Sequence, residues 1–132
     1  MYLETSMPRP SPLSGRRIER GDAVSGPCGL LAIVVNVRGT TATLCRILQN
    51  PRYRHRSDVQ IGLGDAVALG ISVGNKVRCR VFRMNVRHLA RRDATISDDL
   101  LARVRAAVEK EDAITRWERA ETRLGGVSRI YG

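Results

Sequence analysis

The side chains best suited to chemistry on a polyanion lie in one polar segment, residues 49–56, where three arginines alternate with Tyr53 and His55. Metal-free cleavage of RNA requires a base for the 2′-hydroxyl, an acid for the leaving oxygen and cations for the charged transition state. Histidine changes protonation near neutral pH, and arginine binds phosphate through two parallel hydrogen bonds. His55 and Arg54 are therefore the predicted catalytic residues. The alternative is a solvated basic loop with an incidental histidine.

A second group of arginines lies in segments with strand-like alternation. Residues 76–82 place Val77, Cys79 and Val81 on one face, and Arg78 and Arg80 on the other. With the loop arginines they predict one basic surface that binds phosphates. The predicted nucleic-acid-binding residues are Arg46, Arg52, Tyr53, Arg56, Arg78, Arg80, Arg83 and Arg87.

Two other interpretations of these arginines stay open, a docking groove for an acidic protein and a solvated charged face. The sequence has only five aromatic residues, and Tyr53 alone lies inside the basic loop. Base stacking would be limited, so recognition of RNA would depend on the phosphate backbone.

The net charge of +10 comes from 21 arginines and two lysines against 13 acidic residues. The charge is unevenly placed: residues 1–20 carry +2, residues 21–96 carry +8, and residues 97–132 carry none. A field concentrated in the middle of the chain attracts nucleic acid or an acidic protein segment.

Other kinds of chemistry find little support. Three cysteines, at positions 28, 45 and 79, form no CxxC pair, so neither a disulfide framework nor a zinc site is expected. Residues 62–65, Gly-Leu-Gly-Asp, are too short for a dinucleotide-binding loop and predict a turn. We expect no metal and no cofactor. The longest apolar run, residues 30–35, is far too short to span a membrane, and with no signal core the expected location is the cytoplasm.

The elements that must position these residues are short strands followed by one helix. Residues 1–20 predict a flexible basic tail, residues 21–124 a single domain and residues 125–132 a short tail. Strands are predicted at 23–24, 30–37, 41–48, 58–61, 76–82 and 86–89. With the helix, they predict a mainly β fold of the α+β class, a small SH3-like barrel with a packed amphipathic helix.

The helix is predicted to begin at Ser97, whose side chain caps it, with Asp98 and Asp99 at the positive end of its dipole. Gly125 and Gly126 are predicted to end it. Within its extension, residues 113–124, Ile114, Trp117 and Leu124 recur at helical spacing. They indicate either core packing or a contact with a dimer mate or partner.

The stretch from Lys76 to Val108 resembles the C-terminal half of the PemK/MazF family of toxin endoribonucleases. Val77, Cys79, Phe82 and Arg83 fill the positions of a family strand, and Leu89 follows. Residues 94–96 and the sequence Ser-Asp-Asp-Leu-Leu at 97–101, with Val104, then fill the family's helix start. Gly21 and Asp22 resemble the family's opening, and residues 30–36 and 57–61 resemble two of its strands. The resemblance spans about residues 20–110. It implies an SH3-like barrel, a homodimer and an acidic antitoxin partner.

The sequence departs from the family at positions that carry chemistry. Leu30 and Leu31 stand where the family has Arg-Pro, Leu48 stands where it has Thr or Ser, and Arg80 replaces an Asp. The segment from Val24 to Leu30 leaves almost no room for the family's long first loop.

Three functions follow. The first is a PemK/MazF-like toxin that binds RNA and cleaves it without metal. The second is a catalytically inactive barrel that binds nucleic acid or an acidic protein. The third is a structural subunit of a ribonucleoprotein or phage particle.

Overall fold

The computed structural model describes residues 17–49 and 53–131, with side chains through residue 123. Arg52 and most of the predicted N-terminal tail lie outside the described residues, so those predictions stay untested. None of the helices in the described part of the chain is both long and apolar enough to cross a bilayer.

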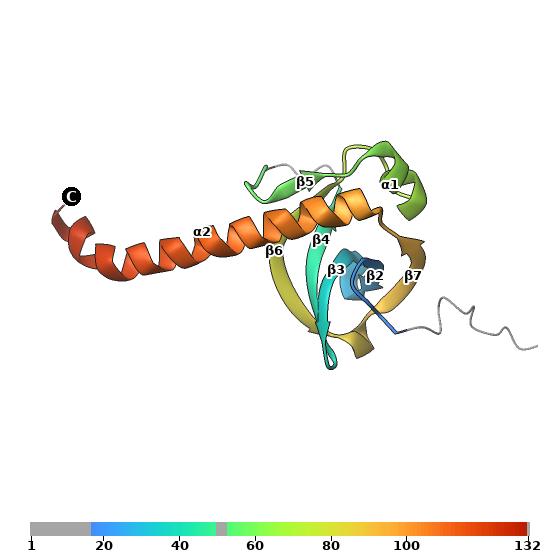
Figure 1. Ribbon diagram of the computed structural model, residues 1–132, viewed down its shortest axis with the longest axis horizontal. Coiled ribbons are helices and arrows are strands. Elements are labelled where there is room, and N and C mark those ends of the chain that lie inside the picture. The colour runs from blue at the N-terminus through green and yellow to red at the C-terminus, as the bar shows by residue number, and fades with distance from the viewer. Residues whose placement is uncertain (1–16, 50–52, 132) are drawn as a thin grey trace, which may run out of the picture.

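Six antiparallel strands form one curved sheet, in the order β5-β6-β4-β3-β2-β7. Their bounds are β2 Asp22–Gly26, β3 Leu30–Arg38, β4 Thr41–Leu48, β5 Asp58–Gln60, β6 Lys76–Asn85 and β7 Ala90–Thr95. Figure 1 shows the strands curling into a barrel, with one long helix laid across it and running past its edge. The predicted fold class, a small barrel with a C-terminal helix, is confirmed.

Each face of the sheet carries its own apolar cluster, because side chains alternate between the two faces of a strand. On one face Ile33, Cys45 and Val77 pack beneath the helices α1 (Leu63–Leu69) and α2 (Asp98–Tyr131). On the other face, which we call the outer face, Val34 and Leu44 pack with partly buried residues that include Phe82. Residues of β2, β3, β4 and β6 contribute to both clusters, so these four strands separate the helix side from the outer face.

The start of α2 is as predicted, and its end is not. The Leu100 backbone N–H donates to Ser97 Oγ at 3.1 Å, which is the predicted cap. Leu100 and Val104 are fully buried against the barrel. The helix continues through Gly125 and Gly126 to Tyr131, so the predicted end at these glycines is wrong. Glycine permits a helix to end because it adopts the left-handed conformation easily, but it does not require the end.

Three elements differ from the prediction because their apolar patterns are weak. Residues 62–65 are not the predicted turn: Gly62 is the N-cap of α1 and residues 63–65 are its first turn. This helix buries Ala66 and Leu69 and ends at Gly70, whose φ is 69°. Residues 86–89, predicted as a strand, form the 3-10 helix η2 (Val86–His88). The last strand is β7, whose polar sequence ARRDAT gives no alternation and which pairs with β2 through its backbone.

Candidate nucleic-acid interface

Strand register places two of the predicted arginines side by side. Arg46 of β4 is directly opposite Arg78 of β6, and Arg78 is directly opposite Asp58 of β5. Like charges that face each other across two strands destabilise a sheet. The Arg46 guanidinium lies 5.5 Å from the centre of the Phe82 ring, so it stacks on the outer face and remains exposed.

Arg78 is occupied in holding the loop that precedes β5. Its Nε and Nη2 donate to the two carboxylate oxygens of Asp58 at 2.8 and 3.0 Å, and its Nη2 also donates to the Tyr53 carbonyl at 2.8 Å. Burial by itself raises the pKa of Asp58. The hydrogen bonds from Arg78 and from the His55 N–H outweigh burial, so that pKa is lowered. Asp58 therefore stays ionised and neutralises Arg78.

Arg56 fastens the same loop to α2. Its guanidinium donates to both oxygens of Glu111, at 2.8 and 3.1 Å, and to both oxygens of Glu118, each at 3.0 Å. Glu111 is only 5% exposed, and its hydrogen bonds with Arg56 lower its pKa and raise the pKa of Arg56. Two carboxylates thus surround one guanidinium, which leaves it little capacity to bind phosphate.

His55 is oriented by its own neighbours. Its Nδ1 accepts the Ser57 backbone N–H at 3.1 Å and lies 2.6 Å from Ser57 Oγ. Because Nδ1 is an acceptor, the neutral ring carries its hydrogen on Nε2. In this state Nε2 donates a hydrogen bond and does not remove a proton. Arg54, beside it, is exposed and has no hydrogen bond or ion pair within the described residues.

The structure distributes the other predicted residues over several places instead of one surface. Arg80 is exposed and shares the outer face with Arg46 and Arg78, as the alternation predicts, and Tyr53 is 73% exposed next to Arg78. Arg83 lies on the helix side, in a cavity of about 360 Å³ that α2 also lines. Because Phe82 and Met84 join the outer cluster, Arg83 between them points the other way.

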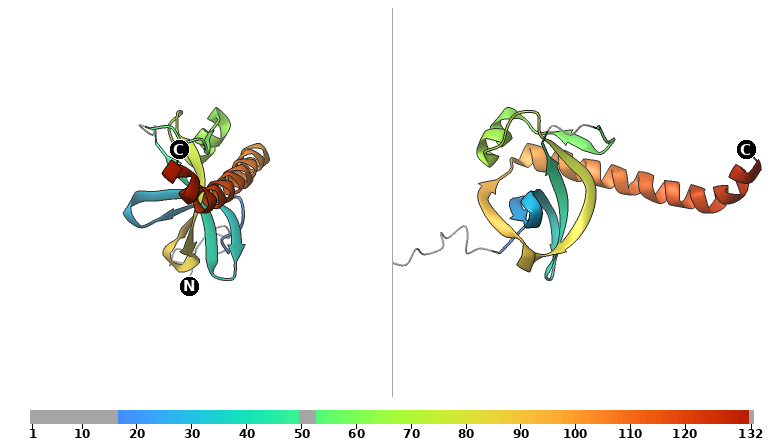
Figure 2. Two further views of the ribbon diagram at one scale, coloured as in Figure 1. Left: turned by 90° about the vertical axis from the view of Figure 1, so that its left-hand side faces the viewer. Right: turned by 180° about the vertical axis from the view of Figure 1, so that it is seen from behind.

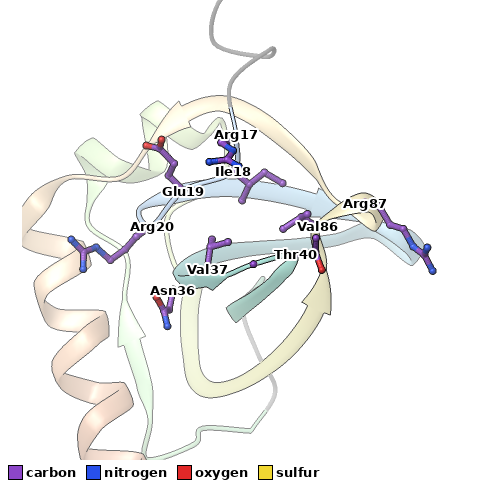
Figure 3. A pocket seen from close by; sticks show the side chains of 10 residues that line it. Arg17, Ile18, Glu19, Arg20, Asn36, Val37, Thr40, Val86 and Arg87 are labelled. Atoms are coloured by element: carbon purple, nitrogen blue, oxygen red, sulfur yellow. The ribbon is translucent and has the colours of Figure 1, made fainter.

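Arg87 lines a separate groove of about 830 Å³, formed by residues 17–20, the turn between β3 and β4, and η2. In Figure 3, Ile18, Val37 and Val86 point into its centre, while Arg87 and Arg20 point away at its two ends. Sequence reasoning missed Arg17 and Arg20 because they were assigned to the tail.

A smaller cavity of about 290 Å³ lies where β3 begins and β4 ends, next to the 3-10 helix η1 (Pro27–Gly29). Leu30, Leu31 and Leu48 line it together with Arg46. Asn75 also lines it and is 3% exposed, and its Oδ1 has no hydrogen-bond partner in the described part of the chain. The described lining residues include no histidine and no carboxylate, so this cavity holds no evident general base.

Neither a metal site nor a reactive thiol stands out. Within residues 17–49 and 53–131, no three His, Cys, Asp or Glu side chains are grouped to hold a metal ion. Cys45 and Cys79 are buried next to each other. The hydrogen bond with Cys79 and the burial raise the pKa of the Cys45 thiol, so it is inert.

Comparison with solved structures identifies the fold. The chain is similar to the MazE–MazF complex of Deinococcus radiodurans, with a TM-score of 0.58, 14% identity, and coverage of 74% of this chain and 98% of that one. It is also similar to an endoribonuclease from a mycobacterial species, with a TM-score of 0.57, 14% identity, and coverage of 72% of this chain and 90% of that one. No family model and no curated protein matches the sequence. The chain therefore has the MazF/PemK-like fold that the sequence resemblance implied.

Three of the positions at which the sequence departs from the PemK/MazF pattern lie together in the small cavity. Leu30 and Leu31 at the start of β3 and Leu48 at the end of β4 line the same hollow, although they are distant in sequence. These are the positions at which the PemK/MazF resemblance implies a catalytic Arg and a catalytic Thr or Ser. The cavity therefore presents leucine side chains at the positions where that family's chemistry would need polar groups, although Arg46 and Asn75 line it elsewhere.

Proposed function

We propose that this protein binds single-stranded RNA on the outer face of β4 and β6, as a MazF-like component of a toxin–antitoxin type system. The observation that carries the proposal is the juxtaposition of Arg46 and Arg78 with a single carboxylate, Asp58, beside them. That carboxylate is occupied by Arg78. We call Arg46, Arg54 and Arg80 the open arginines, because none has a carboxylate partner within the described residues.

The open arginines suit the phosphate backbone of RNA. Arginine donates two parallel hydrogen bonds to phosphate, and each neutralised phosphate releases counterions. Tyr53 adds one exposed aromatic ring for stacking a base. The predicted binding is therefore strongly dependent on salt and weakly dependent on base sequence.

We propose that the RNA bound on the outer face is not cleaved. The cavity lined by Leu30, Leu31 and Leu48 lies where the family resemblance implies the catalytic groups, and it does not provide them. The three leucines supply neither a cation nor a hydroxyl, and Arg46, which lines the same cavity, has no histidine or carboxylate among the described lining residues to act as a base beside it.

A second candidate is metal-free cleavage at the loop, where His55 lies beside the exposed Arg54. His55 would act in its imidazolium form, with a proton on Nδ1 in place of the hydrogen bond from the Ser57 N–H. Its Nε2–H would protonate the leaving oxygen and leave the neutral ring, water would take the 2′-hydroxyl proton, and Arg54 would hold the phosphate.

The same open arginines also fit an acidic protein segment. A small acidic antitoxin in the cytoplasm is the partner that the family resemblance implies, and its carboxylates would compete with RNA for Arg46 and Arg80. We propose this competition as the regulation of the site. A neighbouring gene for a small acidic protein would support it.

The test is incubation of the purified protein with a long single-stranded RNA in EDTA, with fragment ends mapped. Intact RNA that is shifted at low salt and released at high salt is the expected result. Cuts at a short fixed sequence that disappear in an Arg54→Ala/His55→Ala variant would establish the second candidate instead. Intact RNA that is not shifted even at low salt would contradict RNA binding and assign the open arginines to a protein partner.

A further inference from the structure

The small cavity at the start of β3 contains two groups that the proposed function does not use. One is the thiol of Cys28, and this residue of η1 is exposed and lines the cavity. The other is Asn75, which lines the same cavity and is 3% exposed. Its Oδ1 is the one buried side-chain oxygen or nitrogen that lacks a hydrogen-bond partner among the described residues. A buried acceptor without a donor costs free energy, so it indicates that a ligand supplies the donor.

The backbone at Cys28 adopts a conformation that residues with side chains rarely tolerate. Its φ and ψ are 58° and 37°, and it is the one non-glycine residue with a positive φ in the part of the chain that the structure describes. Glycine would be unstrained at this position. Strained residues are frequent at ligand-binding sites, where the surrounding structure holds them in place. Figure 2 shows the blue connection between β2 and β3, which contains η1, on the side of the barrel opposite the orange first half of α2, so the helix does not cover it.

Arg46 and the apolar wall of the cavity define the kind of ligand that fits. Arg46 lines the cavity and has no carboxylate partner within the described residues. Leu30, Leu31 and Ile71 supply apolar contacts. The volume of about 290 Å³ lies just below the usual range of small-molecule sites, about 300–1,000 Å³, so the ligand is small. A matching ligand has a carboxylate for Arg46 and an N–H donor for Asn75.

We propose that Cys28 is a modification site, at which it forms a mixed disulfide with a small thiol that carries carboxylates and amide N–H groups, such as the tripeptide glutathione. A carboxylate of the tripeptide pairs with Arg46, and one of its amide N–H groups donates to Asn75 Oδ1. Nothing about the Cys28 thiol alone marks it as reactive; its neighbours in the cavity do. Cys45 and Cys79 are buried, so they are not modified.

The modification is a thiol–disulfide exchange with glutathione disulfide as the co-reactant. The Cys28 thiolate attacks one sulfur of that disulfide, because the thiolate and not the thiol is the nucleophile. The bond from Cys28 Sγ to this sulfur forms while the sulfur–sulfur bond of the disulfide breaks. The other half leaves as a thiolate and takes a proton from water. Cys28 is thereby oxidised, and the leaving half is reduced to glutathione.

The adduct regulates the RNA binding proposed above, and this consequence rests on that proposed function. The bound tripeptide occupies Arg46, one of the open arginines, and adds two carboxylates against one amine. RNA affinity therefore falls about tenfold on modification, because one phosphate contact is lost and negative charge is added. Reduced glutathione restores RNA binding by reversing the exchange.

The experiment equilibrates the full chain in buffers of reduced and oxidised glutathione and measures the modified fraction by intact mass and peptide mapping. We expect one adduct per chain, at Cys28, and none in Cys28→Ser. Arg46→Ala and Asn75→Ala each lower the equilibrium constant for the adduct on the order of tenfold, because each removes one contact with the bound tripeptide.

Two controls separate the cavity from general thiol reactivity. Arg80→Ala removes an outer-face arginine that is not among the described residues lining the cavity, and it leaves the equilibrium constant unchanged. Cystamine, a disulfide whose halves carry an amine and no carboxylate, gives an adduct that Arg46→Ala does not weaken. Arg46 is exposed, so Arg46→Ala carries the test even where thermal unfolding shows that Asn75→Ala does not fold.

The absence of a Cys28 adduct overturns the proposal. So does an equal loss in Arg46→Ala and Arg80→Ala, or a loss in Arg46→Ala that is the same with cystamine. The mobility shift of RNA with modified and unmodified protein then tests the regulation. An adduct that leaves RNA affinity unchanged overturns the regulation. An adduct on a protein that binds no RNA even at low salt overturns the proposed function and supports the modification site.

Discussion

Two groups of arginines lie next to each other around the loop before β5 and behave differently. Arg56 and Arg78 are each bound by carboxylates, Arg56 by Glu111 and Glu118 and Arg78 by Asp58. The open arginines, Arg46, Arg54 and Arg80, are exposed and have no such partner in the described part of the chain. The first group fixes the loop between β6 and α2. The second group leaves positive charge on the outer face, at Arg46 and Arg80, and on the loop before β5, at Arg54.

The number of arginines in a segment does not by itself locate a binding surface. All five arginines were predicted together as one basic surface, from strand alternation for Arg46, Arg78 and Arg80 and from the basic loop for Arg54 and Arg56. What separates them is whether the fold brings a carboxylate within reach. Charge that the fold leaves without a counterion is the charge available to a ligand.

Charge reversal in the open group has the largest expected effect. Arg46→Glu/Arg80→Glu lowers RNA affinity about a hundredfold, because two phosphate contacts are replaced by two repulsions. Electrophoretic mobility shift at fixed low salt measures it. The matched control, Arg105→Glu/Arg119→Glu on α2, changes the net charge equally. An equal loss in the control would show that the total charge, and not the outer face, binds RNA.

Removing a carboxylate partner of Arg56 distinguishes an effect on stability from an effect on RNA binding. Glu111→Ala leaves the Arg56 guanidinium with Glu118 as its carboxylate partner, so we expect the melting temperature to fall by several degrees. RNA affinity changes less than about threefold, because the open arginines are untouched and Arg56 gains freedom. Thermal unfolding and the mobility shift are measured on the same preparation. A large loss of affinity with an unchanged melting temperature would reverse the assignment of the two groups.

Low pH weakens the ion pairs of Arg56 and Arg78 by protonating their carboxylate partners. The pKa values of Asp58 and Glu111 are lowered in the folded protein from ordinary values of 3.8 and 4.5. A carboxylate whose pKa is lowered by folding stabilises the folded protein at pH values above its ordinary pKa. This stabilisation is lost as the pH falls through the lowered pKa of the folded state. The free energy of unfolding should therefore fall below about pH 4.5, and Glu111→Gln should flatten that fall. If Glu111→Gln and the wild type showed the same dependence of the unfolding free energy on pH, the Arg56–Glu111 ion pair would not contribute to stability.

The smallest expected effect is on the salt dependence of binding. Arg46→Ala reduces the slope of log affinity against log salt by about 1, since one phosphate contact is lost. An alanine at Arg83, on the helix side of the barrel, leaves the slope unchanged. Titrations at four salt concentrations distinguish the two. Equal slopes for wild type and Arg46→Ala would place the phosphate contacts elsewhere.

Much of the fold follows from local pattern. The strand Thr41–Leu48 was predicted with its observed bounds, and β3 within one residue, because apolar and β-branched residues there are bounded by a clear turn. The cap at Ser97 has an unambiguous local signature. β7 and α1 were missed because β7 has no large apolar side chain to mark an alternation and α1 is too short to show a helical period.

The site was predicted only in part, because several of its contacts join residues that are distant in sequence. Alternation placed Arg78 and Arg80 on one face, which burial in the structure agrees with. The partners of Arg56 are 55 and 62 residues away on α2, and only the docking of that helix onto the barrel brings them near. The same is true of Leu30 and Leu48, which share a cavity because β3 pairs with β4.

The most direct test of the account is to map where RNA contacts the protein. A single-stranded RNA with 4-thiouridine is bound at low salt, crosslinked with ultraviolet light and located by mass spectrometry of peptides. The account predicts crosslinks at Tyr53 and in the peptides of β4 and β6 that contain Arg46 and Arg80, which disappear in Arg46→Glu/Arg80→Glu. Crosslinks confined to the groove of Arg17 and Arg87, or to α2, would contradict it.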